Sequence, residues 1–190
     1  MITTYGGRKV DPLNLKLEDI NIFDIAHSLA LVNRFNGHTQ RPINVAQHSV
    51  FVMRICKQLS TDVKFHLQAL LHDAAEAYLG DVTKWLKRTP EFKDYRKAEK
   101  RAQDLIWLKY ECSPPINFPK DPVLEFADKL MVRYEAYHSY GPDYDFGGNK
   151  SYHPLDKQEL RLVGDWTYWP WEIAETQFLF DFGECGGTVL

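Results

Sequence analysis

The stretch ALLHDAAEAYLGD, residues 69–81, places a histidine and two acids in an otherwise apolar segment that ends in Gly80-Asp81. It contains no proline and no β-branched residue, and Gly80 stands where a helix would stop, so it predicts the end of a helix. At about 100° per residue, His72, Asp73 and Glu76 fall within one quadrant of that helix. Ionisable groups are costly to bury unless they are paired or bind a metal. The quadrant therefore faces either solvent or a site.

The helical signal continues along nearly the whole chain. No alternating strand pattern is present, and residues 1–17 are expected to be irregular. The sequence therefore predicts an all-α fold. Helices are predicted over 21–35, 45–60, from 60 or 61 to 80, over 91–110 and 122–138, and from Pro170 onwards.

Expected helix caps and breaks divide these segments. Asn44 is the expected N-cap of the second helix, and Ser60 or Thr61 that of the third. Asp121 followed by Pro122 is typical of an N-cap with proline at the first helical position. Loops or breaks are predicted at 36–42, 112–119 and 139–154.

Three of the predicted helices carry an ionisable residue on the face that should be buried. His48 interrupts the apolar stripe of the second helix, and Asp128 interrupts that of the fifth. With His72 and Asp73 they offer two imidazoles and two carboxylates, a suitable ligand set for a divalent cation. Taken singly, each has a simpler explanation: a core histidine bonded to a carbonyl, an aspartate that caps or pairs with arginine, a chance His-Asp pair. Together they favour a site, because each conflicts with its own helix.

Composition limits the partners and the compartment. The 190 residues suffice for a single domain, with a core over about 20–140 and the segment 141–190 packed on it. A net charge of −3 gives no general reason to expect nucleic acid as a partner. The 3 cysteines form no CxxC pair, which favours a reducing, cytoplasmic location. No apolar run has the length of a signal peptide or a membrane span.

The segments RFNGHTQRPINVAQHSV (34–50), ALLHDAAEAYLGDV (69–82) and EFADKL (125–130) resemble the HD-domain metal-dependent phosphohydrolases. The likeness covers about residues 20–140 and is greatest to the 5′-deoxyribonucleotidases and their phage-encoded relatives. It implies a helical bundle with a metal site between core helices. The extra histidines of dinuclear members are missing, which favours one ion (Co²⁺, Mn²⁺, Zn²⁺ or Mg²⁺) with room for a second, weaker one. The implied metal ligands are His48, His72, Asp73 and Asp128.

The resemblance also implies two catalytic acids. Glu76 lies one helical turn beyond His72 and corresponds to the glutamate that positions or deprotonates the attacking water in similar enzymes. Asp81 corresponds to an aspartate beside the sugar or the leaving oxygen, where it could help to hold a second ion. A solvated helix-end acid and a turn aspartate are the simpler explanations for these two residues.

Cationic and aromatic residues near these motifs are candidates for substrate binding. Arg34 and Phe35 match an Asn-Arg-Trp motif of the nucleotidases, with phenylalanine in place of tryptophan, and arginine suits phosphate recognition. Lys87 lies near the position of a lysine in similar enzymes. Lys84 and His38 are further candidates, but an ordinary position on the protein surface explains these two residues equally well.

The function that the resemblance implies is metal-dependent hydrolysis of a small deoxynucleotide. We expect a dNTP triphosphohydrolase that prefers dATP and releases deoxynucleoside and triphosphate, located in the host cytoplasm if phage-encoded. A 5′-deoxynucleotidase acting on dNMPs such as dAMP, and a non-catalytic nucleotide-binding protein, remain alternatives. The resemblance also implies a homo-oligomer. The helix over 91–110 is expected to have a solvated face, and packing or a subunit interface is expected of Trp166, Trp169, Trp171, Phe178 and Phe180.

Overall fold

Helices build the described part of the chain, which confirms the predicted all-α fold. The computed structural model describes residues 1–112, 121–142, 144 and 155–188. In these residues the one sheet is an antiparallel ribbon of β1 (Ile2–Thr3) and β2 (Lys9–Val10). Most of residues 1–17 are turns and irregular chain, as expected, and the two strands were missed because strands of 2 residues are too short to show alternation.

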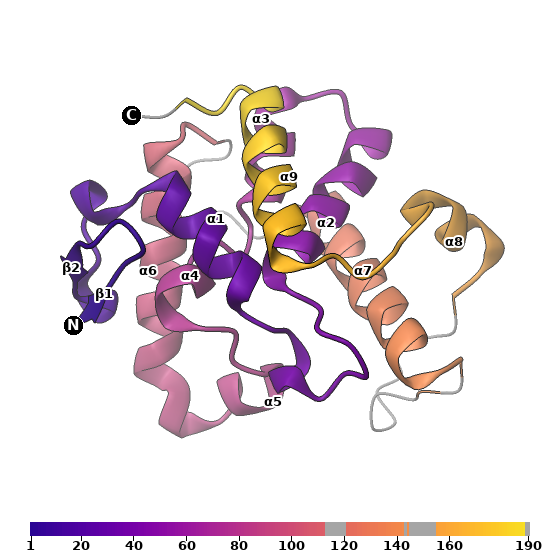
Figure 1. Ribbon diagram of the computed structural model, residues 1–190, viewed down its shortest axis with the longest axis horizontal. Coiled ribbons are helices and arrows are strands. Elements are labelled where there is room, and N and C mark those ends of the chain that lie inside the picture. Colours follow the sequence, from indigo (N-terminus) through magenta and orange to yellow (C-terminus); the bar gives the residue numbers. More distant parts are fainter. Residues whose placement is uncertain (113–120, 143, 145–154, 189–190) are drawn as a thin grey trace.

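Figure 1 shows the helices packed around one another. Brief 3₁₀ turns occur at Pro12–Asn14, Leu17–Asp19, Phe35–Gly37 and Pro90–Phe92. The α-helices are α1 (Ile22–Leu31), α2 (Val45–Leu59), α3 (Val63–Leu70), α4 (Glu76–Leu79), α5 (Lys84–Lys87), α6 (Lys93–Lys109), α7 (Pro122–Tyr140), α8 (Lys157–Val163) and α9 (Trp171–Glu184). Among the described residues, no helix has both the length and the apolarity needed to cross a bilayer.

Two of the predicted caps are confirmed and one is wrong. The side chains of Asn44 and Asp121 accept backbone N–H groups in the first turns of α2 and α7. For α3 the cap is Asp62 rather than Ser60 or Thr61, since the Asp62 carboxylate accepts the bond in that first turn. The helix therefore starts later than predicted.

The first helix is shorter than predicted, and two helices, α5 and α8, were missed. Helix α1 ends at Leu31, so Arg34 lies beyond the helix, and its N–H donates to the Ile43 carbonyl at 2.8 Å. Helix α8 is opened by a capping box, in which Asp156 and Glu159 exchange side-chain to backbone bonds. Most of the predicted break at 112–119 and most of the loop predicted over 139–154 lie outside the described residues, and the loop starts later than predicted because α7 continues to Tyr140.

The third predicted helix is interrupted at residues 71–75, which form turns between α3 and α4. His72, Ala74 and Glu76 donate their backbone N–H groups to the residue three positions earlier. The N–H of Ala75 donates to the side-chain oxygen of Gln103 at 3.1 Å. The single helical quadrant expected for His72, Asp73 and Glu76 is therefore wrong, because these residues do not share one regular helix.

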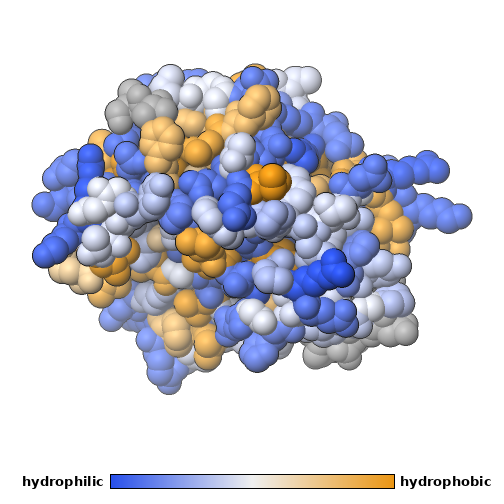
Figure 2. Space-filling model, in the orientation of Figure 1, coloured by the Kyte–Doolittle hydropathy of each residue, from blue (hydrophilic) through white to orange (hydrophobic). Residues whose placement is uncertain are grey.

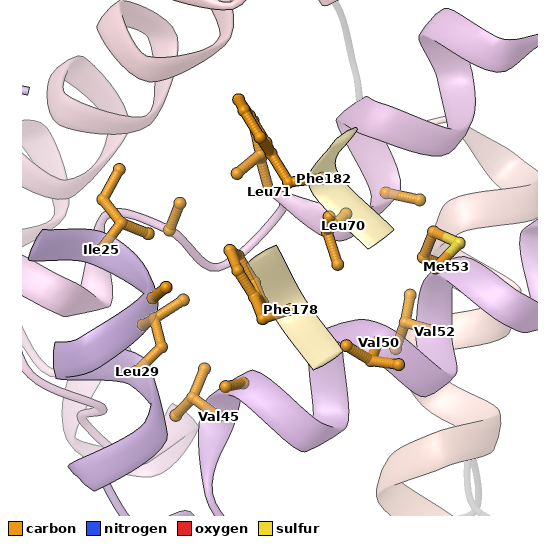
Figure 3. Packing of buried hydrophobic residues seen from close by; sticks show 14 of the residues in the cluster. Ile25, Leu29, Val45, Val50, Val52, Met53, Leu70, Leu71, Phe178 and Phe182 are labelled. Atoms are coloured by element: carbon orange, nitrogen blue, oxygen red, sulfur yellow. The ribbon is translucent and has the colours of Figure 1, made fainter. Parts of the chain in front are cut away.

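Helix α2 forms the centre of the core and packs against α1, α3, α7 and α9. Figure 3 shows Phe178 of α9 between the α1 side chains Ile25 and Leu29 and the α2 side chains Val45 and Val50. Because α2 is covered on several sides, a polar residue on one of its covered faces is isolated from water. His48 is such a residue, with a relative exposure of 0%.

Helix α6 has the solvated outer face that its charges predict, and its Ala98, Ala102 and Ile106 are buried. The C-terminal aromatic residues are divided: Trp166 and Phe178 are buried, whereas Trp171 and Phe180 are exposed. Figure 2 shows that polar residues cover much of one face, with hydrophobic patches between them.

Candidate metal centre

Two histidines point their Nε2 atoms toward one position. Helix α2 holds His48, whose Nδ1 lies 2.9 Å from Glu135 Oε1. The turn after α3 holds His72, whose Nδ1 lies 2.8 Å from the Ala69 carbonyl oxygen. In each ring Nδ1 is engaged by an acceptor, which leaves Nε2 as the atom that can ligate a metal.

Asp128 of α7 completes a possible three-ligand site. One ligand atom from each of His48, His72 and Asp128 lies within 4.8 Å of the other two. Asp128 Oδ1 is 3.3 Å from His48 Nε2 and 3.9 Å from His72 Nε2. Two imidazole nitrogens and a carboxylate oxygen are ligands that divalent cations such as Zn²⁺ accept. These three residues could hold a metal ion.

Asp73, the fourth predicted ligand, lies beside the same atoms. Its Oδ2 is 3.2 Å from His72 Nε2 and 3.7 Å from His48 Nε2. Burial opposes ionisation of this carboxyl, but the nearby His72 and His48 hold its pKa below the usual range. The structure thus brings all four sequence-predicted ligands together.

Burial of the cluster is asymmetric, which matters for access. The side chains of His48 and His72 are 0% and 1% exposed, whereas those of Asp73 and Asp128 are 24% and 26% exposed. The imidazoles therefore form the inner side and the carboxylates the outer side. His48 Nε2 is also a buried polar atom with no hydrogen-bond partner in the described residues, which fits a ligand atom facing a cation.

Glu135 was missed by the sequence analysis. It is fully buried on α7, and its two oxygens accept bonds from His48 Nδ1 and Arg34 Nε, both at 2.9 Å. Burial opposes its ionisation, but the charges of Arg34 and His48 lower its pKa. The signal available in the sequence was its position 7 residues after Asp128, which is the same helix face.

Arg34 lies at the site, although it does not lie on a helix. Its Nη1 is 3.7 Å from Asp73 Oδ2. Burial disfavours the charged guanidinium, but Glu135, Asp81 and Asp73 outweigh that effect and raise its pKa. Phe35, which follows, has a φ of 54°, a conformation that is strained for a bulky side chain. Such strain is often found at functional sites.

Glu76 is buried at the start of α4 and pairs with Lys87. Lys87 Nζ lies 3.3 Å from Glu76 Oε1 and 2.5 Å from Glu99 Oε1. Burial raises the pKa of Glu76 well above its ordinary value, and the charges of Asp73 and Asp81 add to this effect. The other oxygen, Glu76 Oε2, is buried and without a hydrogen-bond partner among the described residues.

The remaining predicted residues divide into two groups. Asp81 is half-buried, and burial raises its pKa. The charge of Arg34 lowers this pKa, and the charge of Asp73 raises it. Asp81 therefore lies within electrostatic range of the centre. His38 and Lys84 are exposed, and no contact joins them to the cluster within the described residues. Their predicted part in substrate binding gains no support from the geometry.

Comparison with known proteins places the chain in a family. No family model matches it. It is 36% identical to the uncharacterized protein YfdR of Escherichia coli over 134 residues, which are 70% of this chain and 69% of YfdR. The chain belongs to the YfdR family. It is also 34% identical to the uncharacterized protein RCAP_rcc00048 of Rhodobacter capsulatus over 135 residues, 69% of this chain and 68% of the relative. The names of these YfdR-family relatives specify no chemistry.

If this YfdR-family chain binds a metal ion at the cluster, the ion should raise the temperature at which the chain unfolds. With free Co²⁺ or Zn²⁺ at about 100 times its dissociation constant, we expect stabilisation of about 2.7 kcal/mol. Asp128→Asn should lose most of this shift, because it removes a ligand charge. Asp94→Asn, an exposed acid paired with Lys97 on α6, is the control and should keep it. Thermal unfolding at rising metal concentration measures the effect, and an undiminished shift in Asp128→Asn would contradict the site.

Proposed function

We propose that the chain is an HD-domain metal-dependent phosphohydrolase that converts deoxynucleoside triphosphates, dATP in preference, into deoxynucleoside and triphosphate. The observation that carries this proposal is the convergence of His48, His72, Asp73 and Asp128 from three separate segments. The buried Arg34 lies beside Asp73 of this cluster, and the charge of Asp73 acts on the buried Glu76.

The cation would be held by the two imidazoles and the two carboxylates. When bound, it supplies Lewis-acid activation of water and of the phosphoryl oxygen. We propose Co²⁺, Mn²⁺, Zn²⁺ or Mg²⁺ as the ion, since histidine and carboxylate ligands accept several metals.

The protein's own groups supply the remaining requirements of phosphoryl transfer. Arg34 is held by Glu135 with its guanidinium beside Asp73, and can bind a phosphate oxygen at the outer side of the cluster. Burial and the charges of Asp73 and Asp81 raise the pKa of Glu76, which makes its carboxylate a stronger base toward water. Asp81, also with a raised pKa, is the further acid beside the sugar or leaving oxygen.

One observation favours the 5′-deoxynucleotidase alternative. A triphosphate needs more positive charge beyond the α-phosphate than a monophosphate does. Lys87, the candidate for that contact, is already engaged by Glu76 and Glu99. Nucleoside triphosphate binding would have to draw Lys87 away from at least one of these carboxylates, or use exposed Lys84 and Arg88 instead.

Product analysis distinguishes these functions. We expect deoxyadenosine and triphosphate from dATP with one of the four metals, slower reaction with other dNTPs, and little turnover of ATP. Turnover confined to dAMP would establish the nucleotidase instead. Nucleotide binding without any turnover would indicate a sensor, and full activity after exhaustive chelation would exclude the metal-dependent mechanism.

A further inference from the structure

A side chain from a different helix forms hydrogen bonds with the backbone at both ends of the interruption between α3 and α4. Gln103 of α6 donates its Nε2 to the Leu71 carbonyl at 2.6 Å and accepts the Ala75 N–H at 3.1 Å with Oε1. In an uninterrupted α-helix the N–H of Ala75 would donate to the carbonyl of Leu71. The amide of Gln103 thus takes the place of one helical hydrogen bond.

Inserting a side chain into the helical ladder has a known consequence, a local kink or break. Here the Ala75 N–H bonds to this buried amide, and the Leu71 carbonyl accepts from the amide and also from the Ala74 N–H at 3.1 Å, so neither group is left unsatisfied. The chain then turns through i→i−3 bonds at His72, Ala74 and Glu76. Such turns advance by about 120° per residue against about 100° in an α-helix.

The opened turn is the segment that carries the candidate ligands. His72 and Asp73 lie between Leu71 and Ala75, the two residues that Gln103 contacts. The carbonyl of Ala69, in the last turn of α3, accepts from His72 Nδ1 at 2.8 Å, which directs His72 Nε2 to the cluster. Glu76 begins α4 directly after the turn.

We propose that Gln103 is a positioning residue for the metal centre: its amide keeps the helix open at residues 71–75 and so directs His72 and Asp73 toward His48 and Asp128. This inference rests on the proposed function, since it assumes that the cluster holds a metal. Gln103 itself contacts backbone groups of the turn, and acts on the cluster through them.

The test compares Gln103→Met with the wild type. Methionine has a similar length but can neither donate to Leu71 nor accept strongly from Ala75. We expect the Co²⁺ dissociation constant, measured by titration, to rise about tenfold or more. Ile106→Val, which removes a buried methyl from the same helix, is the control for general destabilisation and should bind Co²⁺ as the wild type does. Unchanged Co²⁺ affinity in Gln103→Met overturns the inference.

A second variant and a second readout keep the test decisive. If Gln103→Met does not fold, Gln103→Glu replaces it, because a carboxylate keeps the acceptor for Ala75 but loses the donor to Leu71. Hydrogen exchange of the Ala75 amide without metal should be faster in Gln103→Met, which lacks the acceptor, than in Ile106→Val, while Gln103→Glu is tested by its Co²⁺ affinity. If the wild type binds no Co²⁺, the proposed function fails, while unchanged Ala75 exchange would overturn the role of Gln103 itself.

Discussion

Glu76→Gln is expected to lower turnover about a thousandfold while metal affinity stays within a few-fold of the wild type. Glutamine has the shape of glutamate but cannot accept a proton from water. Glu76 Oε2 is buried and unbonded among the described residues, so the substitution leaves no protein donor without its acceptor at that atom. Steady-state kinetics with dATP and a Co²⁺ titration of the same sample give the two quantities.

Glu99→Gln is the matched control for this variant. Glu99 is the other carboxylate on Lys87, at 2.5 Å, but it belongs to α6 and is no part of the cluster. We expect its turnover to change by only a few-fold. A loss in Glu99→Gln equal to that in Glu76→Gln would show that the Lys87 pairing, and not proton transfer by Glu76, is what the reaction needs.

Glu76→Gln is also expected to change how the stability of the metal-free protein depends on pH. Burial and the charges of Asp73 and Asp81 raise the pKa of Glu76 in the folded state above its ordinary value of 4.5. The folded protein then holds this proton more tightly than the unfolded chain, so stability falls as the pH rises above 4.5. Glu76→Gln lacks this loss, and the difference in unfolding free energy should increasingly favour the variant until the pH passes the folded-state pKa. Urea unfolding at several pH values measures it, and a constant difference would contradict the raised pKa.

The four candidate ligands could be predicted because each one breaks a local pattern. An apolar stripe that contains His48 or Asp128 is visible within two turns of a single helix. Most of the helices could also be predicted from the sequence, because periodicity and caps such as Asn44 are local features. The structure then shows that these separate anomalies lie side by side, which the order of residues alone cannot show.

The residues that support the site could not be found in this way. Glu135 bonds to partners 87 and 101 residues away, and Gln103 to partners 28 and 32 residues away. Each is one polar residue on a helix with other polar residues, so its burial depends on packing that no local pattern reports. The break at residues 71–75 was missed for the same reason, because its cause lies on α6.

Glu135→Gln is expected to destabilise the protein by about 3–5 kcal/mol, because it breaks a buried ion pair from one side. The amide cannot accept from both His48 Nδ1 and Arg34 Nε, which now share the carboxylate. We expect Co²⁺ affinity to fall by about 10- to 100-fold, since His48 loses the partner that orients it. We also expect KM for dATP to rise, since Arg34 loses its fixed position.

Glu159→Gln separates these effects from loss of stability. Glu159 forms a buried ion pair with Arg133 of α7, with one contact at 3.2 Å, and no contact among the described residues joins this pair to the cluster. The two variants should therefore lose similar unfolding free energy, while only Glu135→Gln loses Co²⁺ affinity and raises KM. If both variants bind Co²⁺ as tightly as the wild type, Glu135 serves the fold alone. A joint change in Co²⁺ affinity and KM in Glu135→Gln would instead mean that one carboxylate sets the geometry of both the metal ligand and the phosphate-binding arginine.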